Sequence, residues 1–217
     1  MSEFIPEDLF VGDPVLTMRW RLHRRALPLK NRHLRAFSAC GVSNGLASWA
    51  RQHIEWTLAD GAGAFPDGVL VLAVDSEGRA EMTVEAYEGA PALTSAEIAE
   101  RAAGWNGQAV PCEVLWTVEG GALVIHAEEG ATLSGANSFL ADIAKTLKTP
   151  LSFSRRPEPG ETFPQAEEAF LVSDEHGVVT ASDAAGTTAE RFKGYLDRIV
   201  SLAKPDAFDC ANLGIIG

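Results

Sequence analysis

The segment Gln165–Ser182, QAEEAFLVSDEHGVVTAS, has the pattern of a β-hairpin. Two runs rich in apolar and β-branched residues, Glu168–Ser173 and Val178–Ser182, flank the polar turn Asp174–Gly177. Such runs favour strands, and a short turn that contains glycine lets two strands pair in antiparallel fashion. The segment therefore predicts a hairpin near the end of the chain.

The residues between this hairpin and the middle of the chain alternate between strand and helix patterns. A second hairpin is expected around the turn Glu119–Gly121, between the apolar runs Cys112–Val118 and Ala122–Ala127. One more strand and two helices with apolar residues every three or four positions are expected in this half: Leu151–Ser154, Ser138–Leu147 and Thr188–Ala203.

The first half of the chain begins with strand alternation over Val15–Leu22. The elements expected after it are a helix over Asn31–Cys40, a helix from Ser43 or Asn44, and strands over Gly68–Asp75 and Glu81–Tyr87. Thr94 and Glu97 form a capping-box pattern, which predicts a short helix to about Ala103.

This mixture of helices and paired strands predicts the α+β class with two domains. The Gly- and Pro-containing stretch Glu88–Pro91 is the expected boundary. We expect an N-terminal α+β domain over residues 1–88, a shortened connection over 89–109, and a C-terminal α+β domain over 110–217.

Composition excludes several classes of protein. The 217 residues are 46% apolar and 22% charged, as in an ordinary globular protein, and their net charge of −12 argues against nucleic acid or an anionic membrane as the partner. No apolar run is long enough to span a membrane, and since Met1–Phe4 lacks the basic start and apolar stretch of a secretory signal, none is expected. Three widely spaced cysteines fit reduced thiols in a cytoplasmic protein, and no His or Cys cluster predicts a metal site.

The charge is unevenly distributed along the chain. No acidic residue lies between Asp13 and Glu55, but eight Lys or Arg residues do, so the remainder has a net charge of −12 − 8 = −20. One interpretation is a basic edge that faces an acidic neighbouring domain or subunit, where Arg19 and Arg35 form ion pairs. The other is a site for an anion, either a phosphate or a carboxylate.

Five stretches stand in a diagnostic order: Gly12–Trp20 (GDPVLTMRW), Leu29–Cys40 (LKNRHLRAFSAC), Gly120–Ala127 (GGALVIHA), Thr132–Leu147 (TLSGANSFLADIAKTL) and Gln165–Ser182. In this order they resemble the motifs of the class IV aminotransferases, the fold-type IV enzymes that include aminodeoxychorismate lyases and D-amino-acid and branched-chain aminotransferases. The resemblance covers about half of the residues.

The resemblance implies a two-domain, D-amino-acid aminotransferase-like fold, shortened here, that holds pyridoxal phosphate (PLP) between its domains in a homodimer. It also implies amino-group transfer or lyase chemistry on amino acids, which needs a Schiff-base lysine, a carboxylate facing the pyridine nitrogen, and a phosphate cup. The lysine position falls within Glu88–Cys112, which contains no lysine, and the carboxylate position falls within Gln108–Pro111, which contains no acid.

The resemblance assigns the phosphate cup to five residues: Arg35, Gly135, Asn137, Ser138 and Ser173. It assigns no catalytic residue. The family's phosphate-binding arginine stands three residues after the helix histidine, and Ala36 is found there instead. Arg35 stands one place earlier, which rotates it by about 100° around the helix. In the late hairpin, Asp174 stands where a hydroxyl is expected, and its charge would repel a phosphate.

Three hypotheses for function follow. The first is a degenerate relative that is catalytically impaired and binds at most a small anion, such as a phosphate or an amino acid. The second is an active PLP-dependent aminotransferase that uses a lysine at a non-matching position. The third is a non-catalytic interaction protein.

Overall fold

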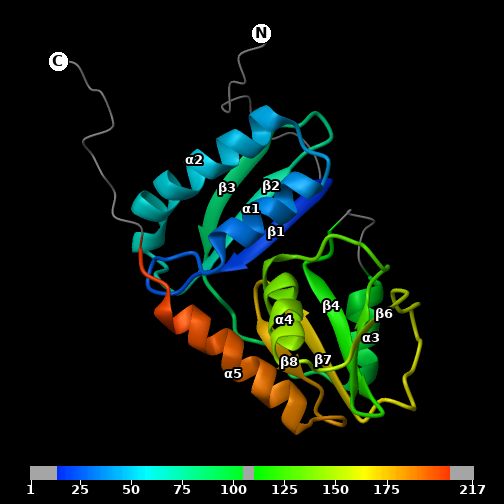
Figure 1. The fold of residues 1–217 in the computed structure, drawn as a ribbon. Coiled ribbons are helices and arrows are strands. Elements are labelled where there is room, and N and C mark those ends of the chain that lie inside the picture. Colours follow the sequence, from blue (N-terminus) through cyan, green and yellow to red (C-terminus); the bar gives the residue numbers. More distant parts are fainter. Residues whose placement is uncertain (1–13, 105–109, 206–217) are drawn as a thin grey trace, which may run out of the picture.

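The computed structural model describes residues 14–104 and 110–205, which fold into two sheets, each with its own helices (Figure 1). The first body contains β1 (Leu16–Arg21), α1 (Lys30–Ala39), α2 (Asn44–Asp60), the 3-10 turn η1 (Gly61–Gly63), β2 (Val69–Val74) and β3 (Ala80–Glu85). The second contains α3 (Ser95–Ala103), β4 (Glu113–Glu119), β5 (Ala122–His126), α4 (Gly135–Thr146), β6 (Leu151–Ser154), β7 (Glu168–Ser173), β8 (Gly177–Thr180) and α5 (Thr187–Leu202).

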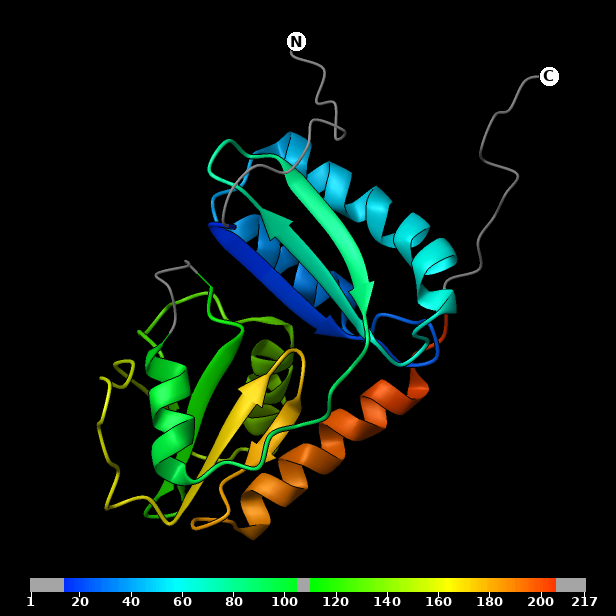
Figure 2. The same ribbon diagram turned by 180° about the vertical axis from the view of Figure 1, so that it is seen from behind.

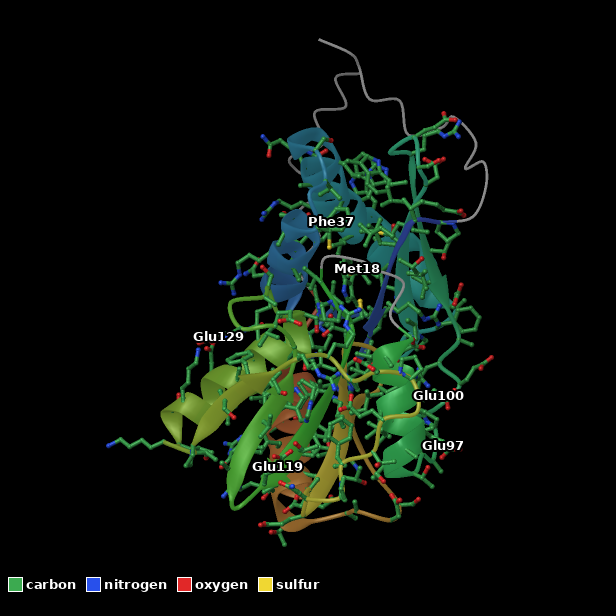
Figure 3. All side chains as sticks on the ribbon, turned by 90° about the vertical axis from the view of Figure 1, so that its right-hand side faces the viewer. Met18, Phe37, Glu97, Glu100, Glu119 and Glu129 are labelled. Carbon is green, nitrogen blue, oxygen red and sulfur yellow. The ribbon has the colours of Figure 1, made fainter. Side chains whose placement is uncertain are left out.

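The first body is an antiparallel three-stranded sheet, β1-β2-β3, with α1 and α2 on one face. Leu16, Met18 and Trp20 alternate along β1 and are buried against these helices. Figure 3 shows Met18 and Phe37 inside this layer. The reverse side of the sheet, seen in Figure 2, is not covered by any helix of the described residues.

The second body is a five-stranded sheet in the order β6-β5-β4-β7-β8, antiparallel except for the β5–β6 pair. Trp116, Phe170 and the other side chains of one face pack against α4 and α5. Leu115, Leu171 and the other side chains of the opposite face pack against α3. The sheet therefore has helices on both faces, and α3 belongs to this body although its residues fall within the predicted connection.

Carboxylates from other parts of the chain cap helices of the second body. Glu168, the first residue of β7, accepts hydrogen bonds from the backbone N–H groups of Thr188 (3.1 Å) and Ala189 (2.8 Å) at the start of α5. Gly186 leaves room for this contact, since a Cβ there would lie 2.1 Å from the Glu168 carboxyl carbon. The capping box of Thr94 and Glu97 at α3 is confirmed.

The two bodies are joined by backbone, ionic and apolar contacts. The Arg21 N–H at the end of β1 donates to the Asp174 carbonyl (3.1 Å). Arg19 forms an ion pair with Glu175 across the boundary, at 2.6 Å. In the same way Arg32 on α1 lies 2.9 Å from Asp142 on α4. The expected basic edge against an acidic neighbouring domain is therefore confirmed for Arg19, and Arg32 also belongs to it. The ion pair expected of Arg35 is not found among the described residues, where its Nε donates to the Asn31 carbonyl.

Further contacts and properties bear on the sequence predictions. The buried Cys112 thiol lies 3.4 Å from the Met18 sulfur, and burial raises its pKa. Cys40 and Cys112 are free thiols, and Cys210 lies outside the described residues. Within residues 14–104 and 110–205, no helix has the length and apolar character needed to cross a membrane.

The helices and strands follow the sequence pattern closely, with one informative difference. The pattern predicts a helix from Ser138, but α4 begins at Gly135. Glycine and asparagine are poor helix formers, so local propensity favours a turn at Gly135–Asn137. A carboxylate from the β7–β8 turn binds the N–H groups of this first helical turn, which extends the helix towards its N-terminus.

We expect Glu168→Ala to lower the free energy of unfolding by about 1–2 kcal/mol, because it leaves two N–H groups at the start of α5 without their acceptor. Chemical denaturation measures this effect. The matched control is Glu167→Ala, at an exposed neighbouring position, which we expect to change the stability by less than about 0.5 kcal/mol. Equal losses in the two variants would contradict the capping role.

Candidate functional site

The candidate site lies where the first turn of α4 meets the turn between β7 and β8. Gly135, Asn137 and Ser138 lie in that first helical turn, and Ser173 is the last residue of β7. Hydrogen bonds from the α4 turn to Asp174, the residue after Ser173, hold the two segments together. The fold thus brings together four of the five residues that the family resemblance assigned to a phosphate cup.

The Asp174 carboxylate sits among the donors of the α4 turn. Its Oδ1 accepts from the Ser134 hydroxyl (2.9 Å) and the Ala136 N–H (2.7 Å), and its Oδ2 accepts from the Gly135 N–H (3.3 Å). His33 Nδ1 lies 3.1 Å from the same Oδ2. The Asp174 side chain is 1% exposed, so protein groups rather than water surround this carboxylate.

His33 brings α1 of the first body against this turn. Its ring stacks on Trp20, with the centroids 5.3 Å apart, and it is itself buried. Gly135 permits this close approach, because a Cβ at that position would lie 2.3 Å from His33 Nδ1. The site is therefore closed by packing as well as by hydrogen bonds.

Asn137 belongs to a buried network that supports Ser134. Its amide nitrogen donates to the Ser134 hydroxyl (3.0 Å) and to the Val172 carbonyl (3.1 Å). Its amide oxygen accepts from the Trp116 indole N–H (2.8 Å). These three hydrogen bonds of the Asn137 amide all go to protein groups. They hold the Ser134 hydroxyl in the orientation in which it donates to Asp174.

The two serines are also engaged within the protein. The Ser138 hydroxyl donates to the Gly135 carbonyl (3.0 Å) and accepts from Arg32 (3.2 Å). The Ser173 hydroxyl donates to Glu113 (3.2 Å) and accepts from the N–H groups of Glu175 and His176 (3.2 Å each). Both side chains act here as turn and cap residues.

Arg35 is the predicted site residue that the fold does not bring to this turn. It is exposed, and its Nε donates to the Asn31 carbonyl one helical turn earlier (3.2 Å). Ala36 is buried instead, one turn from His33. His33 therefore provides the contact from α1 to the α4 turn.

A cavity of about 250 Å³ lies between the bodies next to Asp174. The elements that line it are the end of β1, the start of α1, the exit of β3, the β7–β8 turn and α5. None of the five lysines of the chain (Lys30, Lys145, Lys148, Lys193 and Lys204), all of which are described, lines this cavity. A Schiff base in the cavity would need one of them.

The charges at the rim of the cavity are arranged in pairs. Burial alone would raise the pKa of Glu175, but the hydrogen bond and the charge of Arg19 hold it below its ordinary value. Burial lowers the pKa of His176, and the positive charges of Arg101 and Arg19 act in the same direction, against Glu175 and Glu113. The pKa of His176 therefore lies below its ordinary value of 6.5, and at pH 7 the imidazole is neutral.

Solved structures with the same arrangement of elements exist. The structure of 4-amino-4-deoxychorismate lyase from Pseudomonas aeruginosa superposes with a TM-score of 0.58, at 16% identity, over 84% of this chain and 90% of that one. The chain has the fold of class IV aminotransferases. The fold class predicted from the sequence, a two-domain α+β arrangement of this type, is confirmed.

Other structures of class IV aminotransferase fold give the same result. The branched-chain aminotransferase from Thermoproteus uzoniensis with norvaline has a TM-score of 0.55 at 18% identity, over 85% of this chain and 84% of that one. A hypothetical aminotransferase from Mycobacterium tuberculosis, with α-ketoglutarate and PMP bound, has a TM-score of 0.59 at 14% identity, over 92% and 95%. No protein-family model matches the sequence, and no curated protein matches it either.

The class IV motifs and the helix histidine, His33, could be identified from the sequence, but the site residue Ser134 was missed. From the sequence alone, the charge of Asp174 indicates only that it would repel a phosphate. The available signal was the combination of an acidic residue directly after a buried strand with Ser-Gly at the start of a helix. When the acidic side chain meets the helix start, the free N–H groups of the helix donate to the buried carboxylate, and both obtain hydrogen-bond partners.

We expect Asp174→Ala to lower the free energy of unfolding by about 3 kcal/mol, because it leaves buried donors from two bodies without an acceptor. Chemical denaturation checks the size of the loss. The control is Glu129→Ala, which removes an exposed carboxylate near the start of α4 (Figure 3) and should change stability by less than about 0.5 kcal/mol. A loss below about 1 kcal/mol for Asp174→Ala would contradict its role.

The lowered pKa of His176 predicts a pH dependence of stability. The unfolded state binds a proton near pH 6.5, whereas the folded state binds it only at lower pH, so stability falls as the pH drops below about 6.5. Between about pH 7.5 and 5.5 we expect this fall to be smaller in His176→Asn than in the parent. An NMR titration in which the His176 ring protonates above pH 6.5 would show that the sign is wrong.

Proposed function

We propose that this chain is a catalytically impaired protein of the class IV aminotransferase fold that does not use PLP and binds a different small ligand. The observation that supports this is the position of the Asp174 carboxylate. It uses the Ser134 hydroxyl and the N–H groups of Gly135 and Ala136. A phosphate at this turn would need the same donors and would meet a buried negative charge.

The remaining requirements of PLP chemistry also lack candidates in the cavity. No lysine lines it. Glu113 is the acid nearest in the sequence to the expected pyridine-facing position. It is bound to Arg101 and to the Ser173 hydroxyl. Of the segment Gln108–Pro111, where that position was predicted, Gln108 and Ala109 lie outside the described residues, and Val110 and Pro111 carry no acid. The residues present therefore do not fit the cofactor, and we derive no reaction through it.

The test is to incubate the purified protein with PLP, record the visible spectrum, reduce with borohydride and map modified lysines by mass spectrometry. We expect no saturable aldimine band and only scattered labelling of exposed lysines, because none lies in the cavity. An active class IV aminotransferase treated in parallel is the positive control.

Saturable labelling of one lysine would contradict the proposal and restore the reading of an active enzyme with a displaced lysine. Lys30 is the first to examine, since its side chain is 23% exposed and lies near Glu55 at the first body's edge. Lys30→Arg should then abolish the band, whereas Lys193→Arg, at an exposed position on α5, should leave it unchanged.

A further inference from the structure

The cavity between the two bodies contains a cationic group with an unused donor. Arg21, the last residue of β1, lines the cavity, and its Nη1 is buried without a hydrogen-bond partner among the described residues. A buried donor of a charged group that makes no hydrogen bond is costly, so Arg21 Nη1 needs an acceptor, which a water, an ion or a ligand in the cavity can supply.

Arg21 is held in position by an aromatic ring. Its guanidinium carbon lies 3.3 Å from the centroid of the Tyr87 ring, and Tyr87 also lines the cavity. A planar guanidinium stacked in this way keeps its in-plane N–H groups available. Burial lowers the pKa of Arg21, but from so high a value that it stays charged.

A second donor lies beside it. Arg101 can only donate, so the His176 Nε2 that lies 3.2 Å from its Nη2 accepts. In a neutral imidazole the other nitrogen, Nδ1, then carries the hydrogen, and it lies 3.4 Å from the Tyr87 hydroxyl oxygen. This oxygen therefore acts as an acceptor towards His176, and its own hydrogen remains free to donate to a ligand.

The rest of the cavity favours a small ligand with an apolar part. Leu29, Leu196 and Val200 line it together with the polar groups. Its volume of about 250 Å³ is below the roughly 300–1,000 Å³ of sites for drug-sized molecules. Asp174 and Glu175, which also line it, are engaged by donors of the protein, and Asp197 on α5 is exposed at its edge.

We propose that this cavity binds a small monocarboxylate, whose oxygens accept hydrogen bonds from Arg21 and from the Tyr87 hydroxyl while its apolar tail lies against Leu29, Leu196 and Val200. One cation matches one negative charge, and a guanidinium offers a carboxylate two parallel N–H groups. A phosphate dianion is disfavoured by the three carboxylates that line the cavity. This inference rests on the proposed function, because the carboxylate can bind only if PLP does not occupy the cavity.

The test is to titrate the PLP-free protein with isovalerate and to measure binding by isothermal titration calorimetry and by NMR of the backbone amides. Acetate, the neutral analogue isovaleramide and inorganic phosphate are titrated in parallel. We expect saturable binding of isovalerate, at least about tenfold weaker binding of isovaleramide and of acetate, and no saturable binding of phosphate.

Variants test whether Arg21 and Tyr87 bind the carboxylate. Arg21→Gln should weaken isovalerate binding at least about tenfold, and Tyr87→Phe roughly fivefold. The control is Arg51→Gln, which removes the same charge from an exposed position on α2 and should leave the affinity unchanged. If Arg21→Gln does not fold, Arg21→Lys keeps the charge but loses the planar fork, and it should still weaken binding several-fold.

The proposal is overturned if none of the carboxylates binds saturably, if phosphate binds more tightly than isovalerate, or if Arg21→Gln and Arg21→Lys bind like the parent. These results differ from those of the PLP experiment. If one lysine forms an aldimine but isovalerate binding still depends on Arg21, the proposed function fails while the carboxylate site stands. If no aldimine forms and no carboxylate binds, the proposed function stands and the carboxylate site is overturned.

Discussion

A charged carboxylate removed from water must be surrounded by donors, and Asp174 obtains them from both halves of the chain. Ser134 and the N–H groups of Gly135 and Ala136 belong to the second body, and His33 belongs to the first. Its backbone carbonyl also accepts from Arg21. One residue thus fixes the start of α4, the turn after β7 and the position of α1, and all three of these elements border the cavity beside it.

The same arrangement recurs in the second body. Glu168 binds the N–H groups at the start of α5, and Asp183 binds the N–H and hydroxyl of Ser95 at the start of α3. In each case an acid of the chain meets the positive end of a helix, where an external anion would otherwise be favoured. An external anion is therefore not expected at these three helix starts, and a side-chain cation such as Arg21 is informative in a chain with a net charge of −12.

Much of the fold could be predicted because its signals are local. Strand alternation, such as Leu16, Met18 and Trp20 facing one side, and the capping box at Thr94 depend on neighbours along the chain. The start of α4 could not be predicted, because the acceptor that stabilises Gly135 in a helix lies 39 residues away. Arg21 and Tyr87 escaped notice for the same reason, since only the fold shows that one covers the other.

The His33–Asp174 contact joins residues that are 141 positions apart in the sequence. Closing so long a loop costs conformational entropy before the contact contributes any stabilisation. Local hairpins such as β4–β5 and β7–β8 need no such closure and can form early. We therefore expect the two bodies to dock late in folding, and the turn at the start of α4 to close only then.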